Sequence, residues 1–579
     1  MQRTLIVSLA ILFGVVPSIA QPTAIAQPTA IVGGTVVNPE GAPVVDDATV
    51  LIEGGRIAAV GPRAEVEVPA GATVVDARGR YLIPGLTDGH VHFFQSGGLY
   101  TRPDAIDLRT ARSYDEELAR IKQRLPDTFA RYLRSGITSV VDVGGPMWNL
   151  DVRAMADTMA KAPRVTVAGP LISSVERPEL DEGDPPILKI ETPAAARAEV
   201  QRQVEAGVDL IKIWYIVRPN ETPAAYRPVV EATIDAAHGA GLRVAVHATQ
   251  LETARAAIDA GADILVHSVS DAPVDDAFVQ RAADNDVLYT PTIMVGERYR
   301  EVFAQQLDLT VPEHQLAHPG VIRSLFDLRA LPDSLVSPGM RQFMQSNRTI
   351  PSDSTAIRNL RVLHAAGVPI VAGTDAGNIG TPHGPALHRE IELMRAAGLS
   401  PREILTTATV GGARLAGHDD RGIIEAGHRA DLVVLDADPR TDIKHWSTIY
   451  RVVKDGRAFT PEELVEVTPA HAVQRHVNAY NARDLEGFLS TLADSVALYD
   501  FPGTFRQQGK AWARANYQEL FGIAPNLHVE ITNRMVQGRT VVDKERITGL
   551  PGRDMPYEAI AIYRINEERL VERVDLIEE

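Results

Sequence analysis

A chain of 579 residues is longer than one hydrophobic core can fill, so its length predicts two to four domains. Hydrophobic residues make up 45% and charged residues 23% of the sequence, as is typical of globular proteins. The net charge of −17 argues against nucleic acid as a partner, because phosphate binding needs a basic surface. The absence of cysteine excludes disulfides, thiolate metal ligands and a thiol nucleophile.

The first twenty residues have the layout of a secretory signal peptide. Arg3 supplies a positive charge, residues 5–16 form a short apolar run, and Ser18 and Ala20 place small residues before a cleavage point at Gln21. An uncleaved anchor is the alternative. Later apolar runs are too short to cross a bilayer, so we expect export to the periplasm or secretion, with no membrane contact after cleavage.

Short β-like segments lie on both sides of a long middle part. Four are expected within residues 30–82, between Gly, Pro and Asn turns, and two more at 430–435 and 449–454. We expect residues 21–82 and 420–460 to form one small β-sandwich around an inserted domain.

The middle part, residues 83–419, alternates short apolar strands with amphipathic helices such as 194–206, 226–240 and 251–260. Eight alternating strands predict a parallel (β/α)8 barrel of the triosephosphate-isomerase type, with a doubly wound open sheet as the alternative. A polar and helical insertion, 296–355, is expected over the barrel mouth. The strand candidates are 81–86, 137–143, 164–169, 210–214, 243–248, 264–268, 288–293 and 369–373.

The pattern changes after Pro461. Helices are expected at 470–482, 485–492 and 510–521, followed by three or four strands between 527 and 576. These elements predict a separate α+β domain over residues 465–579, which is an ordinary domain size.

The strongest indication of chemistry is the segment P-G-L-T-D-G-H-V-H at residues 84–92. His90 and His92 are two positions apart at the end of a strand, so both side chains project to the same face. The carboxyl ends of barrel strands are where active sites lie, and two neutral imidazoles there form half of a zinc site. An H-x-H pair alone is weak evidence for a metal site, but its place directly after the P-G-L-T-D-G segment strengthens that evidence.

Further polar residues close later strands. His247 ends the fifth candidate strand, His267 the sixth and Asp375 the eighth. Each could be a hydrogen-bonded core residue, but together they would be costly in an apolar barrel unless a metal or hydrogen bonds satisfied them. Lys212 lies inside the apolar fourth strand, where lysine is rare. It could form an ion pair, or react with carbon dioxide to give a carbamate that bridges two metals.

These motifs resemble the amidohydrolase superfamily, in particular its imidazolonepropionase-like and prolidase-like secreted branch. The resemblance spans residues 31–460 and also rests on G-V-D-L-I-K-I around Lys212, V-A-V-H-A-T at His247, L-V-H-S at His267, A-G-T-D-A-G at Asp375, H-G-P-A-L-H-R-E at 383–390 and A-D-L-V-V-L-D at 430–436. One departure is Thr249, where the close family often has a second histidine. That departure concerns substrate contacts, not the metal site.

The resemblance implies that His90 and His92 bind a first zinc, that carboxylated Lys212 bridges to a second, and that His247 and His267 bind the second. It also implies that Asp375 binds the first zinc and transfers the proton. The alternative is a single zinc held by His90, His92, His247 and Asp375. Tyr226 and His383 are candidates for contacting a substrate carboxylate or carbonyl, although both could be structural.

The C-terminal domain resembles the SnoaL-like, nuclear-transport-factor-2-like group of cone-shaped α+β folds. The resemblance rests on A-Y-N-A-R-D-L-E-G-F at 479–488, D-F-P-G-T at 500–504 and P-N-L-H-V-E-I at 525–531. Such domains include enzymes and binding modules, so fold alone does not fix the function. Asp500 and His528 are candidate acid–base groups, with a solvated or core role as the stronger interpretation. The domain could also support a homo-oligomer.

The sequence thus predicts a metal-dependent hydrolase that cleaves an amide-type C–N bond of a small substrate, such as a dipeptide or an N-acyl amino acid. A cyclic amide, a lactone or an ester is an alternative substrate. An isomerase or a ligand-binding function of the C-terminal domain is an alternative of another class.

Overall fold

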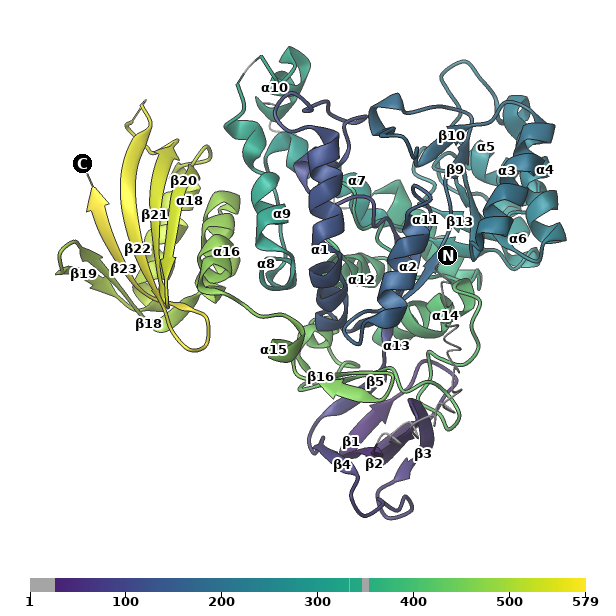
Figure 1. Cartoon of the computed structure of the whole chain (residues 1–579), viewed down its shortest axis with the longest axis horizontal. Helices are drawn as coiled ribbons and strands as arrows, with labels where there is room; N and C mark the ends of the chain where they lie inside the picture. The colour runs from purple at the N-terminus through teal and green to yellow at the C-terminus, as the bar shows by residue number, and fades with distance from the viewer. Residues whose placement is uncertain (1–26, 333, 346–353, 554, 579) are drawn as a thin grey trace, which may run out of the picture.

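Figure 1 shows three parts of the chain: a sheet at the bottom, a central barrel with its helices, and a C-terminal domain at the left. The computed structural model describes residues 27–578 except for 333, 346–353 and 554. The expected signal peptide and its cleavage point lie outside the described residues. None of the described helices combines the length and the apolar character that crossing a membrane requires.

The bottom sheet joins segments from both flanks of the barrel. Its eight strands include β5 (Tyr81–Pro84), which pairs antiparallel with β15 (Leu432–Leu435), so the two flanks meet directly. Buried aliphatic residues such as Leu82, Leu432 and Val453 form its core. The other strands are β1 (Thr29–Val37), β2 (Val44–Glu53), β3 (Arg56–Pro62), β4 (Thr73–Asp76), β16 (Ile449–Lys454) and β17 (Arg457–Phe459).

The central part is the predicted (β/α)8 barrel. Its strands pair in parallel, and isolated bridges close the ring, from Ala168 to Leu210, from Tyr289 to Ile370 and from Val91 to Ala376. The open-sheet alternative is therefore wrong. The strands are β6 (Leu86–Val91), β7 (Ile137–Asp142), β8 (Arg164–Val167), β11 (Leu210–Trp214), β12 (Arg243–His247), β13 (Ile264–Val266) and β14 (Leu288–Thr290).

Two strand predictions need correction. The expected strand 81–86 is divided, because β5 belongs to the flanking sheet and the barrel strand β6 begins only at Leu86. The expected eighth strand, 369–373, takes its place in the ring through the bridges of Ile370 and Ala376 but is not a regular strand. The segment ends at Gly373, where a side chain would not fit, because an added Cβ would lie 2.9 Å from the backbone nitrogen of His90.

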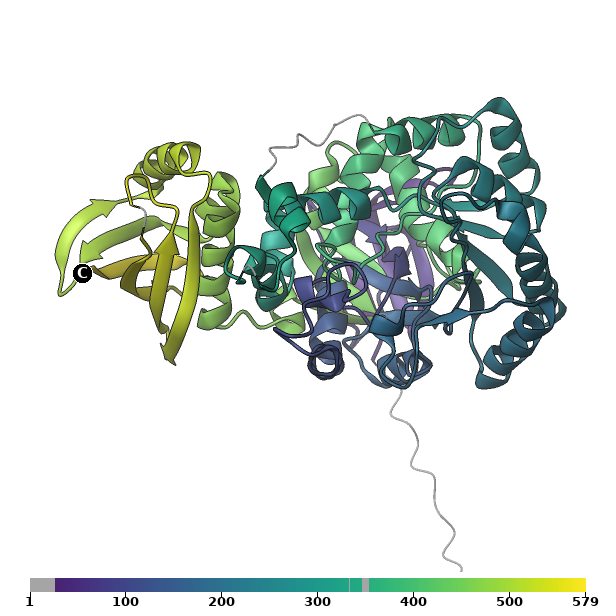
Figure 2. The same cartoon turned by 90° about the horizontal axis from the view of Figure 1, so that it is seen from above.

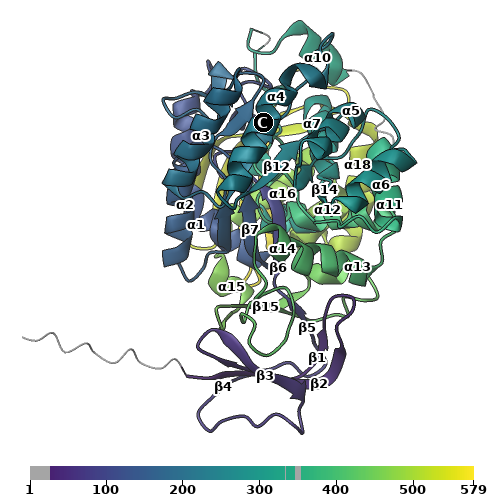
Figure 3. The same cartoon turned by 90° about the vertical axis from the view of Figure 1, so that its right-hand side faces the viewer.

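Helices surround the barrel, as Figure 3 shows from its right-hand side. Most of them follow a barrel strand, and local signals fix their ends. Thr192 caps α3 by accepting a hydrogen bond from Ala195 N, and Gly207 ends it in the left-handed conformation. These helices are α1 (Tyr114–Arg134), α2 (Asn149–Thr158), α3 (Pro193–Ala206), α4 (Pro223–Gly239), α5 (Leu251–Asp259), α6 (Asp276–Asp284), α11 (Thr355–Ala365), α12 (Ala386–Ala396), α13 (Pro401–Thr406) and α14 (Gly412–Leu415).

The insertion after β14 is mostly helical. Buried Arg298 bonds both carboxylate oxygens of Glu313 at 2.6 and 2.7 Å and also pairs with Glu301, so an ionic network holds the segment together. Its helices are α7 (Ile293–Ala304), α8 (Val311–Leu316), α9 (Pro319–Ser324) and α10 (Pro338–Gln345).

The C-terminal domain has the predicted α+β composition. Its six-stranded sheet has the order β19-β18-β23-β22-β21-β20, and α16 (Pro469–Ala482) lies between this sheet and the insertion (Figure 2). Asn478 donates to the carbonyl of Pro319 in α9 at 2.9 Å. The remaining elements are α15 (Pro461–Leu464), α17 (Leu485–Ser490), α18 (Lys510–Ile523), β18 (Leu492–Asp500), β19 (Thr504–Gln508), β20 (His528–Gln537), β21 (Thr540–Thr548), β22 (Tyr557–Ile565) and β23 (Val571–Glu578).

Candidate metal centre

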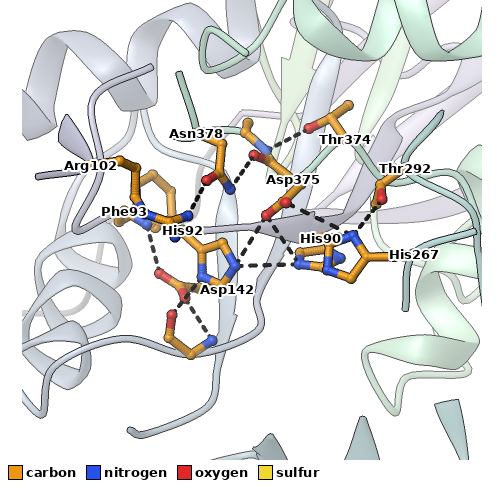
Figure 4. Close-up of polar contacts among 12 residues, drawn as sticks. His90, His92, Phe93, Arg102, Asp142, His267, Thr292, Thr374, Asp375 and Asn378 are labelled. Atoms are coloured by element: carbon orange, nitrogen blue, oxygen red, sulfur yellow. Dashed lines mark hydrogen bonds and ion pairs between the residues drawn. The ribbon is translucent and has the colours of Figure 1, made fainter. Parts of the chain in front are cut away.

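Polar side chains from separate strands meet at one end of the barrel (Figure 4). They come from strand β6, from the ends of β12 and β13, and from the segment that closes the ring, while Lys212 lies in the middle of β11. The six residues predicted as metal ligands, His90, His92, Lys212, His247, His267 and Asp375, are thus brought to one place. Five of them line one cavity, and His90 lies beneath it.

The distances among three of these side chains fit a metal. Asp375 Oδ1 lies 3.3 Å from His90 Nε2 and 3.2 Å from His92 Nε2, and the two nitrogens are 3.3 Å apart. Two ligand atoms bound about 2.1 Å from a tetrahedral zinc are roughly 3.4 Å apart. The three side chains therefore already have the spacing of a common coordination sphere.

A second group of imidazoles lies beside the first. The rings of His247 and His267 are 4.3 Å apart, and the ring of His267 is 4.8 Å from that of His90. His267 Nδ1 is 3.9 Å from Asp375 Oδ2. Ligand atoms of His90, His267 and Asp375 all fall within 4.8 Å of one another.

Several buried atoms of this cluster lack hydrogen-bond partners. They are Lys212 Nζ, Asp375 Oδ1 and His90 Nδ1, in side chains that are almost completely buried. Because an unsatisfied buried polar group costs free energy, their convergence in one cluster points to a bound ligand. Metal ions, and a carbamate on Lys212, would satisfy Asp375 Oδ1 and Lys212 Nζ, so the residues present fit a metal centre.

Neighbouring groups orient the ligands. His92 Nδ1 donates to the carbonyl of Gly144 at 2.6 Å, which leaves Nε2 with a free lone pair for a metal. Asp142 in turn accepts a bond from Gly144 N at 3.0 Å, and so fixes the loop that carries that carbonyl. His267 Nδ1 is bonded to Thr292 Oγ1 at 2.8 Å.

Asp88 connects the two ligand-bearing segments. It is completely buried and accepts bonds from Thr374 N at 3.0 Å, Thr374 Oγ1 at 2.7 Å and His90 N at 3.3 Å. Burial raises the pKa of its carboxyl to about 7, although these bonds oppose the shift. Asp88 therefore fixes the segment of His90 against the segment of Asp375, where the first and last strands of the barrel meet.

The backbone is strained at the same place. His267, Thr292 and Asp375 have φ angles of 75°, 42° and 62°, in the left-handed region that residues other than glycine rarely adopt. Such conformations cost about 1–3 kcal/mol each and are concentrated at functional sites. The strain directs the side chains of His267 and Asp375 toward the cluster.

Burial makes the site favour neutral nitrogen ligands. Burial, and next the charge of Lys212, lowers the pKa of His90 well below its usual value. The pKa of His247 and of His267 is lowered in the same direction, mainly by burial. Burial lowers the pKa of Lys212 to about 7, although Asp375 opposes the shift. A lysine with this pKa has a large neutral fraction at neutral pH, which is the form that reacts with carbon dioxide.

A cavity of about 470 Å³ opens above the cluster. Two of its lining residues, Arg102 and Arg177, share one carboxylate. Arg102 binds both oxygens of Asp104 at 2.7 Å, and Arg177 Nε lies 3.5 Å from the same group. Arg177 also stacks over Trp214, with 4.9 Å to the ring centre. Two guanidinium groups thus share the single carboxylate of Asp104 at this wall of the cavity.

Other lining residues come from the insertion. Tyr299 of α7 donates to Asn378 Oδ1 at 2.8 Å, and Arg102 Nη1 donates to the same oxygen at 2.5 Å. The expectation that the insertion lies at the barrel mouth therefore holds for α7. Thr249, the departure from the family pattern, also lines the cavity.

The two predicted substrate contacts are not at this cavity. His383 is buried behind the cluster, where it donates from Nε2 to the carbonyl of Gln95 at 2.8 Å and bonds the Tyr132 hydroxyl at 2.7 Å. Tyr226 lies in α4 against Tyr215, with its ring centre 5.8 Å away. Neither lines the cavity, so the structure places both outside the wall that surrounds the cluster.

The candidate groups of the C-terminal domain have structural surroundings. Asp500 forms an ion pair with Arg506 at the surface. His528 is buried in the domain, and burial lowers its pKa to about 4. Neither lines the cavity of that domain.

Sequence reasoning missed several residues of the site. Asp142, like Asp375, directly follows an apolar run, V-V-D, and that position could have indicated it. Arg102 and Arg177 lie in irregular segments and do not end an apolar run, and Thr292 depends on a backbone conformation that no residue pattern predicts.

Comparison with known proteins agrees with this geometry. Residues 81–459 match the amidohydrolase family and residues 473–573 the SnoaL-like domain. Imidazolonepropionase of Caulobacter vibrioides (strain NA1000 / CB15N) is 26% identical over 432 residues, covering 69% of this chain and 90% of that protein. A deaminase of 5-methylthioadenosine and S-adenosylhomocysteine from Natronomonas pharaonis is 25% identical over 482 residues, covering 78% and 96%. Adenine deaminase 3 of Rhizobium meliloti is 49% identical, but over 59 residues and 10% of each protein.

Solved structures share the fold. A Xaa-Pro dipeptidase with bound methionine superposes with a TM-score of 0.56 at 23% identity, covering 75% of this chain and 100% of that one. Molinate hydrolase superposes with a TM-score of 0.58 at 23% identity, covering 77% and 97%. The family match extends over more than half of the chain and contains every residue of the metal cluster. The chain therefore belongs to the amidohydrolase family.

Proposed function

We propose that the protein hydrolyses the C–N bond of a small substrate that carries a carboxylate, such as an N-acyl amino acid or a dipeptide. The observation that carries this proposal is the pair of guanidinium groups, of Arg102 and Arg177, that share one carboxylate in the cavity above the metal cluster. Guanidinium groups bind carboxylates with good geometry, so this wall is suited to hold the acid end of the substrate. The names of the relatives, an imidazolonepropionase and a dipeptidase, agree with cleavage of C–N bonds.

The residues that would hold divalent metal are His90, His92, His247, His267, Asp375 and modified Lys212. Bound zinc would lower the pKa of water to about 7 and so supply a hydroxide at neutral pH. It would also polarise the carbonyl of the substrate. The chain contributes the rest. Asp375 lies within the cluster and takes a proton from the nucleophile and returns it to the leaving nitrogen. The network of Asp88 and Thr374 keeps its backbone in place.

A comparison of paired substrates tests the carboxylate. N-acyl amino acids should be cleaved with kcat/KM at least about tenfold higher than their C-terminal amides, because a charge-assisted bond contributes about 1.5–3 kcal/mol. Arg177→Gln should remove this preference by raising KM for the acids only. Arg197→Gln, an exposed arginine of α3, is the control. Equal rates for acids and amides with the wild type would reject the carboxylate but not the hydrolase.

We also propose two zinc ions bridged by carboxylated Lys212. Support comes from the buried, unpartnered Nζ of Lys212 and from its place on the wall that also holds His247 and His267. Metal analysis should find about two zinc ions per chain when bicarbonate is present during reconstitution. Lys212→Ala should hold one or fewer and regain activity with a short-chain carboxylic acid. A stoichiometry of one that bicarbonate does not raise would support the single-zinc alternative.

Export and assembly complete the proposal. The charge and apolar run of residues 1–20 support cleavage near Gln21 and a periplasmic or secreted protein. N-terminal sequencing that finds Met1 on cytoplasmic protein would reject export. Exposed Phe505 in the edge strand β19, and exposed Phe501 in the turn before it, support a homo-oligomer through the C-terminal domain. A monomeric mass in light scattering would reject it.

A further inference from the structure

A second large cavity lies at the junction between the barrel and the C-terminal domain. Its volume is about 580 Å³. It is lined by the end of α1, by α8 of the insertion, and by α16 and the loop 567–570 of the C-terminal domain. In Figure 1, α8 and α9 lie between α1 and α16. Both domains therefore contribute to its walls, and none of the metal-cluster residues does.

Two arginines that reach this cavity from helices lack partners. Arg134 of α1 and Arg475 of α16 form no hydrogen bond or ion pair with any residue that the structure describes, and Arg475 Nε is buried. The neighbouring Arg131, in contrast, has hydrogen-bond partners for its guanidinium group. It bonds both oxygens of Asp127, at 2.6 and 3.2 Å, and the carbonyls of Leu316 and Ala317.

The two unpartnered guanidinium groups lie in an unfavourable field. Burial, and next the charges of Arg131 and Arg134, lower the pKa of Arg475 to about 9. Burial also lowers the pKa of Arg134, against the opposing effect of Glu462. The cost of holding these like charges together is removed when an anion binds between them.

A third group comes from the insertion. The His314 side chain of α8 is almost fully buried and lines the cavity, and its Nδ1 has no hydrogen-bond partner. Its Nε2 lies 2.9 Å from Asp484 Oδ2 in the C-terminal domain. Carboxylates also line the cavity, but none makes an ion pair with Arg134 or Arg475 among the described residues; they are Glu462, Glu466, Glu567 and Glu568.

We propose that this cavity binds the oxyanion group of a small molecule, a phosphate or a carboxylate, through Arg134 and Arg475. The planar N–H groups of arginine match the oxygens of either anion, and His314 adds a polar contact at the wall. Because α1 belongs to the barrel and α16 to the C-terminal domain, the bound anion joins the two domains. Its binding therefore stabilises their docked arrangement.

Titration calorimetry of the full-length, metal-loaded protein tests the site, with inorganic phosphate and succinate as separate probes at low ionic strength. We expect saturable binding of at least one probe, and the tighter probe identifies the anion class. Arg475→Gln and Arg134→Gln should each weaken that binding by at least about tenfold, as expected for a lost charge-assisted hydrogen bond. Arg475→Lys should restore part of the affinity.

Controls separate this site from the barrel. Arg197→Gln, on the exposed face of α3, should bind the probe like the wild type. Anion binding that survives both Arg134→Gln and Arg475→Gln belongs to another place, such as the metal centre, and would overturn the proposal. Absence of saturable binding of either probe to the wild type would overturn it as well. Circular dichroism verifies that the variants are folded.

Discussion

The barrel cavity and the cavity of the C-terminal domain both contain buried ionisable groups, but these groups differ in whether they have hydrogen-bond partners. The C-terminal cavity, of about 140 Å³, is lined mainly by aromatic and aliphatic residues such as Phe488, Trp512 and Tyr517. Its buried carboxyl, Glu545, accepts a bond from the Tyr563 hydroxyl at 2.7 Å. In the barrel, Lys212 Nζ and Asp375 Oδ1 are equally buried and have no hydrogen-bond partner.

The difference shows which feature indicates a metal site. Burial of an ionisable group is common to both cavities and raises or lowers pKa values in each. Convergence of several ligand atoms that lack partners occurs, within the described residues, in the barrel cluster. The C-terminal cavity is instead suited to an apolar ligand, with one carboxyl for orientation.

The strongest test of this comparison removes one carboxylate from each cavity. Asp375→Asn should lower kcat by about 10²–10⁴-fold, because a general acid–base group is lost. Glu545→Gln makes the same chemical change in the other domain. It should leave kcat within about twofold, because substitutions at distant sites act independently. Steady-state kinetics on metal-loaded proteins measures both. Near-normal turnover of Asp375→Asn would show that another group transfers the proton.

Metal removal should separate the two regions thermally. When free zinc is about 1,000 times its Kd, it adds about 4 kcal/mol to the stability of the part that binds it. Calorimetry after dialysis against a chelator should therefore show a lower barrel transition and an unchanged C-terminal transition, together with loss of activity. Equal shifts of both transitions would mean that the two parts unfold as one unit or that the metal binds elsewhere.

The buried carboxyl of the C-terminal cavity predicts a pH dependence. Burial raises the pKa of Glu545 from 4.5 to about 7, so the folded protein holds this proton more tightly than the unfolded chain. The stability of the domain should therefore fall, by about 3 kcal/mol, as the pH rises from about 4.5 to about 7, and stay level above that. Glu545→Gln should lack this fall in denaturant titrations at pH 5 and pH 8. Exposed Glu572→Gln should retain it.

The sequence predicted the parts of the molecule that depend on local patterns. Apolar runs placed β7, β8 and β11 to β14 within a few residues, because parallel barrel strands are buried on both faces. Residues that directly end such runs, His247, His267 and Asp375, were placed correctly at the cluster. Their shared position at the carboxyl ends is a consequence of the fold class.

The remaining features depend on tertiary contacts. His383 was expected at the substrate because it follows Asp375 on a loop, but it turns into the core, where Tyr132 and Gln95 satisfy both ring nitrogens. Arg102 and Arg177 meet at Asp104 although they are far apart in the chain. No local period encodes such meetings, so the walls of the cavity were not predictable.

The smallest effect concerns how far the two regions are coupled. Asn478 and Asn481 lie one turn apart on α16 and are both buried, but they bond different partners. Asn478 donates across the junction to the carbonyl of Pro319 in α9, at 2.9 Å. Asn481 bonds Val529 of its own domain, accepting from its nitrogen at 2.7 Å and donating to its carbonyl at 2.9 Å. Asn478 also accepts a bond from Gln474 Nε2 of its own helix at 3.0 Å, so the two asparagines share a role within the domain and differ in that Asn478 also reaches the insertion.

Asn478→Ala should weaken the junction by about 1 kcal/mol, the net contribution of one buried hydrogen bond, and so speed amide exchange in α9 roughly fivefold. Asn481→Ala should speed exchange in β20 and leave α9 near its wild-type rate, because its bonds do not reach the insertion. Hydrogen exchange measured by mass spectrometry resolves the two segments. If Asn481→Ala speeds exchange in α9 as much as Asn478→Ala does, the junction opens only when the whole C-terminal domain unfolds, and the two cavities belong to one cooperative unit.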